Sequence, residues 1–190
     1  MKRAGKRIRR ALPALLLALV LTVGISAAVC RVSLKTTEYT AAVRGLTVPL
    51  RTVVLSDLHS LEYGKDNAAL LARVAQQQPD AIFCVGDFID SDAAPAQLQR
   101  LYQLLRRLGE IAPVFFSPGN HEITYMESHG SELLDAVAAT GATVLYDRWV
   151  QTTLGGAAVR IGGSCGHFRD INRSAKLDYA MEETIGAADV

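Results

Sequence analysis

The sequence contains few cysteines, and beyond residue 10 basic residues do not outnumber acidic ones. The 190 residues include only Cys30, Cys84 and Cys165, which are too few and too scattered for a disulfide scaffold or a thiolate zinc site. Six of the 20 Lys and Arg residues lie in the first ten positions, which leaves 14 basic against 19 acidic residues and a net charge of −5 in the rest. This balance excludes a basic nucleic-acid-binding domain of the usual kind. The hydrophobic content of 49% excludes a disordered chain.

A long uncharged stretch, residues 11–30, follows the basic segment 1–10. Twenty helical residues at ~1.5 Å per residue span about 30 Å, the thickness of the hydrocarbon core of a bilayer. The pattern predicts one transmembrane anchor. A secretory signal peptide is the alternative, because Ser26 and Ala28 have the spacing of a cleavage site. The basic residues orient the N-terminus toward the cytoplasm, so the folded domain is expected at the extracytoplasmic face of the cell membrane.

The remaining residues predict a linker and one α/β domain. Residues 31–50 are expected to form a linker with an edge strand, because residues 36–43 alternate between polar and apolar. From residue 51 to 190, short buried-type strands alternate with segments of helical periodicity, which predicts a parallel sheet. Strands are expected at 51–56, 80–85, 114–116, 143–145, 150–154 and 158–161, and the last short strands are expected to form a hairpin joined by Gly155-Gly156. Helices are expected to begin after Asp66, at Pro95 and after Ser131, and a further helix is expected over 172–185.

Polar residues with metal-binding side chains follow each of the first three predicted strands. The segments are Asp57-Leu58-His59, Gly86-Asp87-Phe88-Ile89-Asp90 and Gly119-Asn120-His121-Glu122. Open α/β sheets bind their ligands at the carboxyl ends of the strands, so these segments are expected to meet there. Carboxylate, imidazole and amide ligands without a nearby thiolate suit manganese, iron or zinc. The two glycines suit a chain that turns sharply where a Cβ would intrude.

These three motifs make the sequence similar to the calcineurin-like metallophosphoesterases, and the membrane-anchored, single-domain bacterial branch fits best. The resemblance covers about residues 50–165 and implies an α/β sandwich and a hydrolase with two divalent metal ions. It implies that Asp57 and His59 hold the first ion, that Asp87 bridges both, and that Asn120 holds the second. It also implies that His121 is the general acid or a donor to a phosphate oxygen, with Asp90 orienting it. Glu122 is expected to be a carboxylate that supports a metal ligand or is merely structural, and not part of the site itself.

The physical chemistry of such a site agrees with these roles. Two cations about 3.5–4 Å apart lower the pKa of a bridging water and clamp the attacking and leaving oxygens of an in-line displacement. They also offset the charge repulsion between a phosphodiester and an anionic nucleophile. A histidine beside a metal ligand can protonate the leaving group when a carboxylate holds its other nitrogen.

The sequence departs from the family pattern after the third motif. The family completes its second metal site with later histidines, typically in Gly-His-x-His, whereas only His129 and His167 remain here. We therefore expect an α/β domain that is incomplete at its C-terminus. The leading hypothesis is a metal-dependent phosphoesterase that cleaves a phosphodiester or pyrophosphate, with lipid-linked or cell-wall substrates favoured by location and nucleic acid disfavoured by charge. A catalytically inactive remnant that binds metal or a partner is the alternative, and an exported phosphatase or nuclease for soluble substrates is a third.

Overall fold

The computed structural model describes residues 13, 16–24, 26, 33–43 and 45–164, and it divides into two units, residues 1–38 and 39–190. In the first unit, residues 16–24 are helical. Within the described part of the chain, no helix is both long enough and apolar enough to cross a membrane. Residues 11–12, 14–15, 25 and 27–30 of the expected anchor lie outside the described residues. The anchor therefore stays a prediction.

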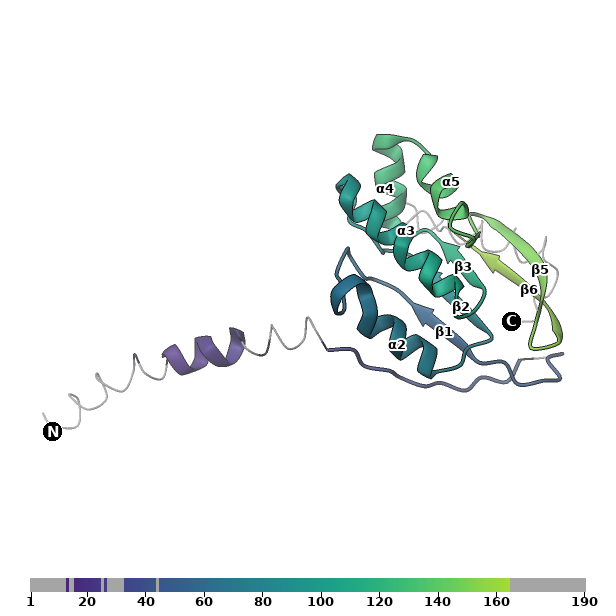
Figure 1. Ribbon diagram of the computed structural model, residues 1–190, viewed down its shortest axis with the longest axis horizontal. Coiled ribbons are helices and arrows are strands. Elements are labelled where there is room, and N and C mark those ends of the chain that lie inside the picture. Colours follow the sequence, from purple (N-terminus) through teal and green to yellow (C-terminus); the bar gives the residue numbers. More distant parts are fainter. Residues whose placement is uncertain (1–12, 14–15, 25, 27–32, 44, 165–190) are drawn as a thin grey trace, which may run out of the picture. The chain divides into compact units, whose positions relative to one another are not determined.

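The second unit is built on a four-stranded parallel sheet with the strand order β1-β2-β3-β4 (Figure 1). The strands are β1 (Thr52–Leu55), β2 (Ala81–Val85), β3 (Val114–Ser117) and β4 (Thr143–Val144). The register pairs Leu55 with Cys84 and Cys84 with Phe116. The carboxyl ends of the first three strands therefore lie side by side, so the three predicted ligand segments leave the sheet at the same end.

The helices connect these strands. They are the 3-10 turn η1 (Lys65–Asn67), α2 (Ala68–Gln76), α3 (Pro95–Gly109), α4 (Asn120–His129) and α5 (Glu132–Ala138). Parallel crossovers are right-handed, and the strands follow one another across the sheet in chain order, so α2 and α3 cover the same face (Figure 1). Ile82, Cys84 and Phe116 are fully buried in the sheet. Burial also raises the pKa of the Cys84 thiol, so it stays protonated as a small core side chain.

An antiparallel hairpin covers part of the opposite face of the sheet. It consists of β5 (Arg148–Leu154) and β6 (Ala157–Gly163), joined at Gly155-Gly156, where φ is +53° and +88°. Its apolar side chains join the sheet in one buried cluster of Ala81, Phe115, Leu145, Leu154, Val159 and Ile161. The predicted strands after residue 51, the hairpin and the parallel sheet are thus confirmed.

One prediction of secondary structure was wrong, and one helix was not predicted. Residues 36–43 form no strand, and Tyr39 is 91% exposed, so the polar–apolar alternation there has no surface to pack against. Residues 120–129, for which we predicted no helix, form α4. Its one buried side chain is Glu122, so the helix lacks the apolar stripe by which an amphipathic helix is recognised. Cys165, His167 and the predicted helix 172–185 lie outside the described residues.

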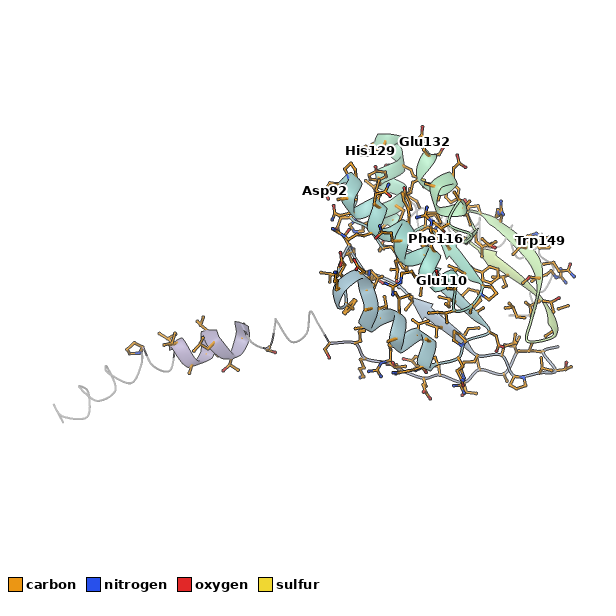
Figure 2. The ribbon with its side chains drawn as sticks, viewed as in Figure 1. Asp92, Glu110, Phe116, His129, Glu132 and Trp149 are labelled. Atoms are coloured by element: carbon orange, nitrogen blue, oxygen red, sulfur yellow. The ribbon has the colours of Figure 1, made fainter. Side chains whose placement is uncertain are left out.

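The core position of Phe116 gives a test of this packing. Figure 2 places Phe116 in the interior of the α/β unit, and its side chain is fully buried. We expect Phe116→Ala to lower the free energy of unfolding by about 3–5 kcal/mol in urea denaturation, and Phe116→Leu by roughly 1 kcal/mol, because only the alanine leaves a large cavity. The exposed Tyr39→Ala serves as the control. Equal losses for Phe116→Ala and Tyr39→Ala would contradict the packing.

Candidate metal centre

The loops after β1 and β2 continue the hydrogen-bond ladder of the sheet. The backbone N–H of Asp57 donates to the carbonyl of Gly86 at 3.1 Å, and that of His59 donates to the carbonyl of Asp87 at 3.0 Å. Ser60 continues the series by donating to Phe88 at 2.8 Å. The first and second ligand segments are therefore fixed to each other beyond the end of the strands.

Two glycines let the second and third segments touch. Gly86 has φ of +86°, and a Cβ on it would lie 2.5 Å from the Cα of Gly119. A Cβ on Gly119 would collide with the backbone nitrogen and the carboxylate of Asp87. No side chain fits at either position without moving backbone, which is the physical reason for glycine in both motifs.

Three of the predicted ligands have left-handed backbone conformations. Asp57, His59 and Asp87 have φ of +57°, +46° and +57°. Residues other than glycine adopt this region at a cost of order 1–3 kcal/mol, and such residues cluster where the surrounding structure imposes a functional geometry. Here the ladder and the contact between the glycines impose it.

Asp57, His59 and Asp87 form a group that can hold one metal ion. Each offers a ligand atom, and these atoms all lie within 4.8 Å of one another. Oδ1 of Asp57 is 3.9 Å from Nε2 of His59. The other carboxylate oxygen of Asp57 accepts a hydrogen bond from the hydroxyl of Ser56. Two carboxylates and one imidazole are a donor set that fits manganese, iron or zinc.

A second group shares His59 with the first. His59, Asp90 and His121 also offer ligand atoms within 4.8 Å of one another. Nδ1 of His59 is 3.0 Å from Oδ1 of Asp90. The rings of His59 and His121 meet edge to face, with their centroids 4.7 Å apart. The structure thus brings both predicted catalytic residues next to the metal ligands.

The partners of His121 differ from those we expected. Its Nδ1 accepts the backbone N–H of Ser91 at 3.2 Å, and its own backbone N–H donates to Oδ1 of Asp87 at 3.0 Å. The family resemblance implies that Asp90 orients His121, whereas in the structure the carboxylate of Asp90 bonds to His59. Asp90 is part of the site, but its contact is with the other histidine.

Asn120 and the later histidine His129 lie at opposite ends of α4. Asn120 is the exposed first residue of the helix, between Gly119 and His121, both of which contact Asp87. His129 is the last residue, about 13 Å along the helix axis. It is exposed and stacks on Tyr125, with ring centroids 4.2 Å apart. Only Asn120 therefore lies near the ligand groups.

Glu122 has the supporting role that we expected. It is fully buried, and its carboxylate accepts four backbone N–H groups. Oε2 accepts from Asp87 at 2.8 Å and Gly119 at 2.9 Å, and Oε1 accepts from Phe88 at 2.7 Å and Ile89 at 3.1 Å. The sequence signal for this role is a glutamate three residues after Gly119, the N-cap residue of α4, because a glutamate at that position commonly accepts the backbone N–H of the N-cap residue.

A hollow elsewhere on the surface does not belong to this site. It has a volume of about 510 Å³ and lies between α5 and the strands β4 and β5. Its lining consists of Leu134, Asp135, Ala138, Ala142, Thr143, Val144, Tyr146 and Arg148. It shares no residue with either ligand group, so we assign the chemistry to the strand ends instead.

The contacts of Glu122 predict a large effect of removing its charge. In Glu122→Gln, a side-chain NH2 group replaces one acceptor oxygen and faces backbone N–H donors. We expect the free energy of unfolding to fall by about 2–4 kcal/mol, measured by urea denaturation, because hydrogen bonds to charged groups are lost in a buried place. Glu110→Gln, at an exposed position (Figure 2), is the matched control and should change the value by less than about 0.5 kcal/mol. Equal values for both variants would show that Glu122 has no special role.

Comparison with known proteins agrees with this geometry. A model of the calcineurin-like phosphoesterase family matches residues 50–180, which include all three ligand segments. The search of curated proteins found no match. The family match covers more than half of the chain, and the α/β unit with its parallel sheet fits a metallophosphoesterase-type fold. The chain therefore belongs to the calcineurin-like phosphoesterase family.

Proposed function

We propose that this chain is a metal-dependent phosphoesterase that hydrolyses a phosphodiester or pyrophosphate bond at the extracytoplasmic face of the cell membrane. The convergence of Asp57, His59 and Asp87 at the carboxyl end of the sheet is the observation that carries this proposal. The left-handed backbone of all three residues supports it, because strain of this kind persists where a geometry is functionally constrained.

Four side chains would hold two divalent ions of manganese, iron or zinc. Asp57 and His59 would bind the first ion, Asp87 both ions, and Asn120 the second. Asp87 suits the shared position because its loop contacts the first segment through the ladder and the third through Gly119. When bound, the two ions activate water for attack and neutralise charge that develops on the phosphoryl oxygens.

His121 would contact the substrate as a hydrogen-bond donor. Its Nδ1 accepts the N–H of Ser91, so in the neutral ring the proton lies on Nε2. This tautomer donates to a phosphoryl oxygen or to the leaving oxygen. The backbone N–H of His121 is held by Asp87, which fixes the ring next to the ligand group.

We place the enzyme at the membrane because of residues 1–30. The helical residues 16–24 expose their large apolar side chains, Leu16, Leu17, Leu19, Val20, Leu21 and Val23, by 54–65%. The six basic residues before them favour an N-terminus in the cytoplasm. Lipid-linked or cell-wall phosphate esters are available at that boundary, and the net charge of −5 beyond residue 10 disfavours polymeric nucleic acid as substrate.

Replacing Asp87 tests the catalytic proposal. With added Mn²⁺, we expect the chain to hydrolyse bis(p-nitrophenyl) phosphate and Asp87→Asn to lose at least about 10³-fold in kcat/KM, because Asp87 would bind both ions. Asp92→Asn makes the same change at an exposed position in the same loop and should keep its activity (Figure 2). Unchanged turnover in Asp87→Asn would contradict the two-metal assignment. No turnover by the parent chain would favour the inactive alternative.

Membrane attachment is tested by fractionating cells. We expect the chain to stay in the membrane pellet after an alkaline carbonate wash, with its N-terminal residues intact by mass spectrometry, because an uncleaved anchor of twenty uncharged, mostly apolar residues resists extraction. Deleting residues 11–30 should release the domain. A mature chain that begins near residue 29 would instead identify the segment as a signal peptide.

A further inference from the structure

We propose that Ser56 is a positioning residue for the metal ligand Asp57, and that its hydroxyl selects the carboxylate oxygen that binds the first ion. This inference rests on the metal centre proposed above. Ser56 is an exposed residue that directly follows β1. Its hydroxyl donates a hydrogen bond to Oδ2 of Asp57. Ser56 thus acts through Asp57 and does not itself bind the ion.

The bond to Oδ2 leaves Oδ1 of Asp57 for the ion. Oδ1 is the oxygen that lies 3.9 Å from Nε2 of His59. Two ligands that each lie about 2.0–2.2 Å from one ion are roughly 3–4 Å apart. The two atoms therefore have nearly the spacing that a shared ion requires. Supporting hydrogen bonds of this kind commonly orient carboxylate ligands at metal sites.

Asp57 needs such a partner because it is the more exposed ligand of the first ion. Its side chain is 66% exposed, against 36% for His59. An exposed side chain changes rotamer freely unless a contact holds it, and holding it costs conformational entropy when the ion binds. The bond from Ser56 restricts Asp57 before the ion arrives.

The shared ligand Asp87 is held in a different way. Its Oδ1 accepts the backbone N–H of His121 at 3.0 Å, and no side-chain substitution at position 121 removes that donor. The carboxylate of Asp57 is held by a side-chain hydroxyl instead. The orientation of Asp57 can therefore be changed by a single substitution at position 56, without altering a metal ligand.

The position of Ser56 leaves its hydroxyl directed to the carboxylate. The backbone of the next residue is fixed, because the N–H of Asp57 donates to the carbonyl of Gly86 at 3.1 Å. The other acceptor near the hydroxyl is the carbonyl of Val85 at 3.5 Å, which is longer than an ordinary O–H···O bond of about 2.5–3.0 Å. A hydroxyl has one proton to donate, and an ionised carboxylate is the stronger acceptor.

Mn²⁺ binding to the full chain, followed by electron paramagnetic resonance, tests the inference without reference to activity. Ser56→Ala should weaken Mn²⁺ binding roughly 10-fold, at the lower end of the losses seen when supporting groups are removed, because the donor is neutral and exposed. Ser56→Thr keeps the hydroxyl and should stay within about threefold. Ser128→Ala removes an exposed hydroxyl elsewhere, on α4, and should stay within about twofold.

Urea denaturation of the metal-free variants separates positioning from folding. Ser56 is exposed, so Ser56→Ala should shift the urea midpoint by less than about 0.3 M. Weaker Mn²⁺ binding with an unchanged midpoint supports the inference. Weaker binding together with a clearly lower midpoint would assign Ser56 a structural role and overturn it. Equal Mn²⁺ affinities of Ser56→Ala and Ser56→Thr, whether weakened or not, would overturn it as well.

A separate variant distinguishes failure of this inference from failure of the proposed function. Asp57→Asn removes a ligand of the first ion, so it should abolish tight Mn²⁺ binding if the metal centre exists. If the parent chain and Asp57→Asn bind Mn²⁺ equally, the metal centre is wrong. If Asp57→Asn loses binding while Ser56→Ala keeps it, the centre stands and only the role of Ser56 is wrong.

Discussion

The carboxylate of Glu122 is the constraint on which the rest of the site depends. Four backbone N–H groups from two separate loops point at this one buried side chain, three from residues 87–89 and one from Gly119. A buried carboxylate is costly unless it is well hydrogen-bonded. Four backbone donors and the place of Glu122 in the first turn of α4 supply that compensation. The charge therefore holds the second ligand loop against the third. Without it, several buried N–H groups would lose their acceptor at once.

A second hydrogen bond, accepted by the carboxylate of Asp87, also connects the second ligand loop to the third. Glu122 of α4 accepts the N–H of Asp87, and Asp87 accepts the N–H of His121, which is the neighbour of Glu122. The two loops are thus linked by two reciprocal hydrogen bonds between a carboxylate and a backbone N–H. The backbones approach each other so closely that only glycine fits at positions 86 and 119. A ligand side chain placed by backbone bonds of this kind keeps its position before any ion arrives. This preorganisation makes the left-handed conformation of Asp87 sustainable.

Much of this arrangement could be predicted from the sequence. The rest depends on contacts between residues far apart in the chain, which local sequence patterns do not indicate. The strands, the hairpin at Gly155-Gly156 and the convergence of Asp57, His59 and Asp87 followed from apolar runs that end in polar motifs, because parallel strands bring their carboxyl ends together. The helix over residues 120–129 could not be recognised by periodicity, since it buries a charge and no apolar stripe. Nor could the partner of Asp90 be chosen, because two histidines lie within reach and the choice depends on where Ser91 places its N–H.

Each of the three acidic side chains of the site accepts a hydrogen bond from the protein. Asp57, Asp87 and Asp90 lie close enough for their charges to repel, yet each accepts a hydrogen bond: from the hydroxyl of Ser56, from the backbone of His121 and from the ring of His59. A carboxylate has about four acceptor positions, so these donors occupy only part of its capacity. Cations would therefore add to the existing bonds and need not replace them. Protein donors thus satisfy part of each carboxylate and leave acceptor positions for the ions of the proposed centre.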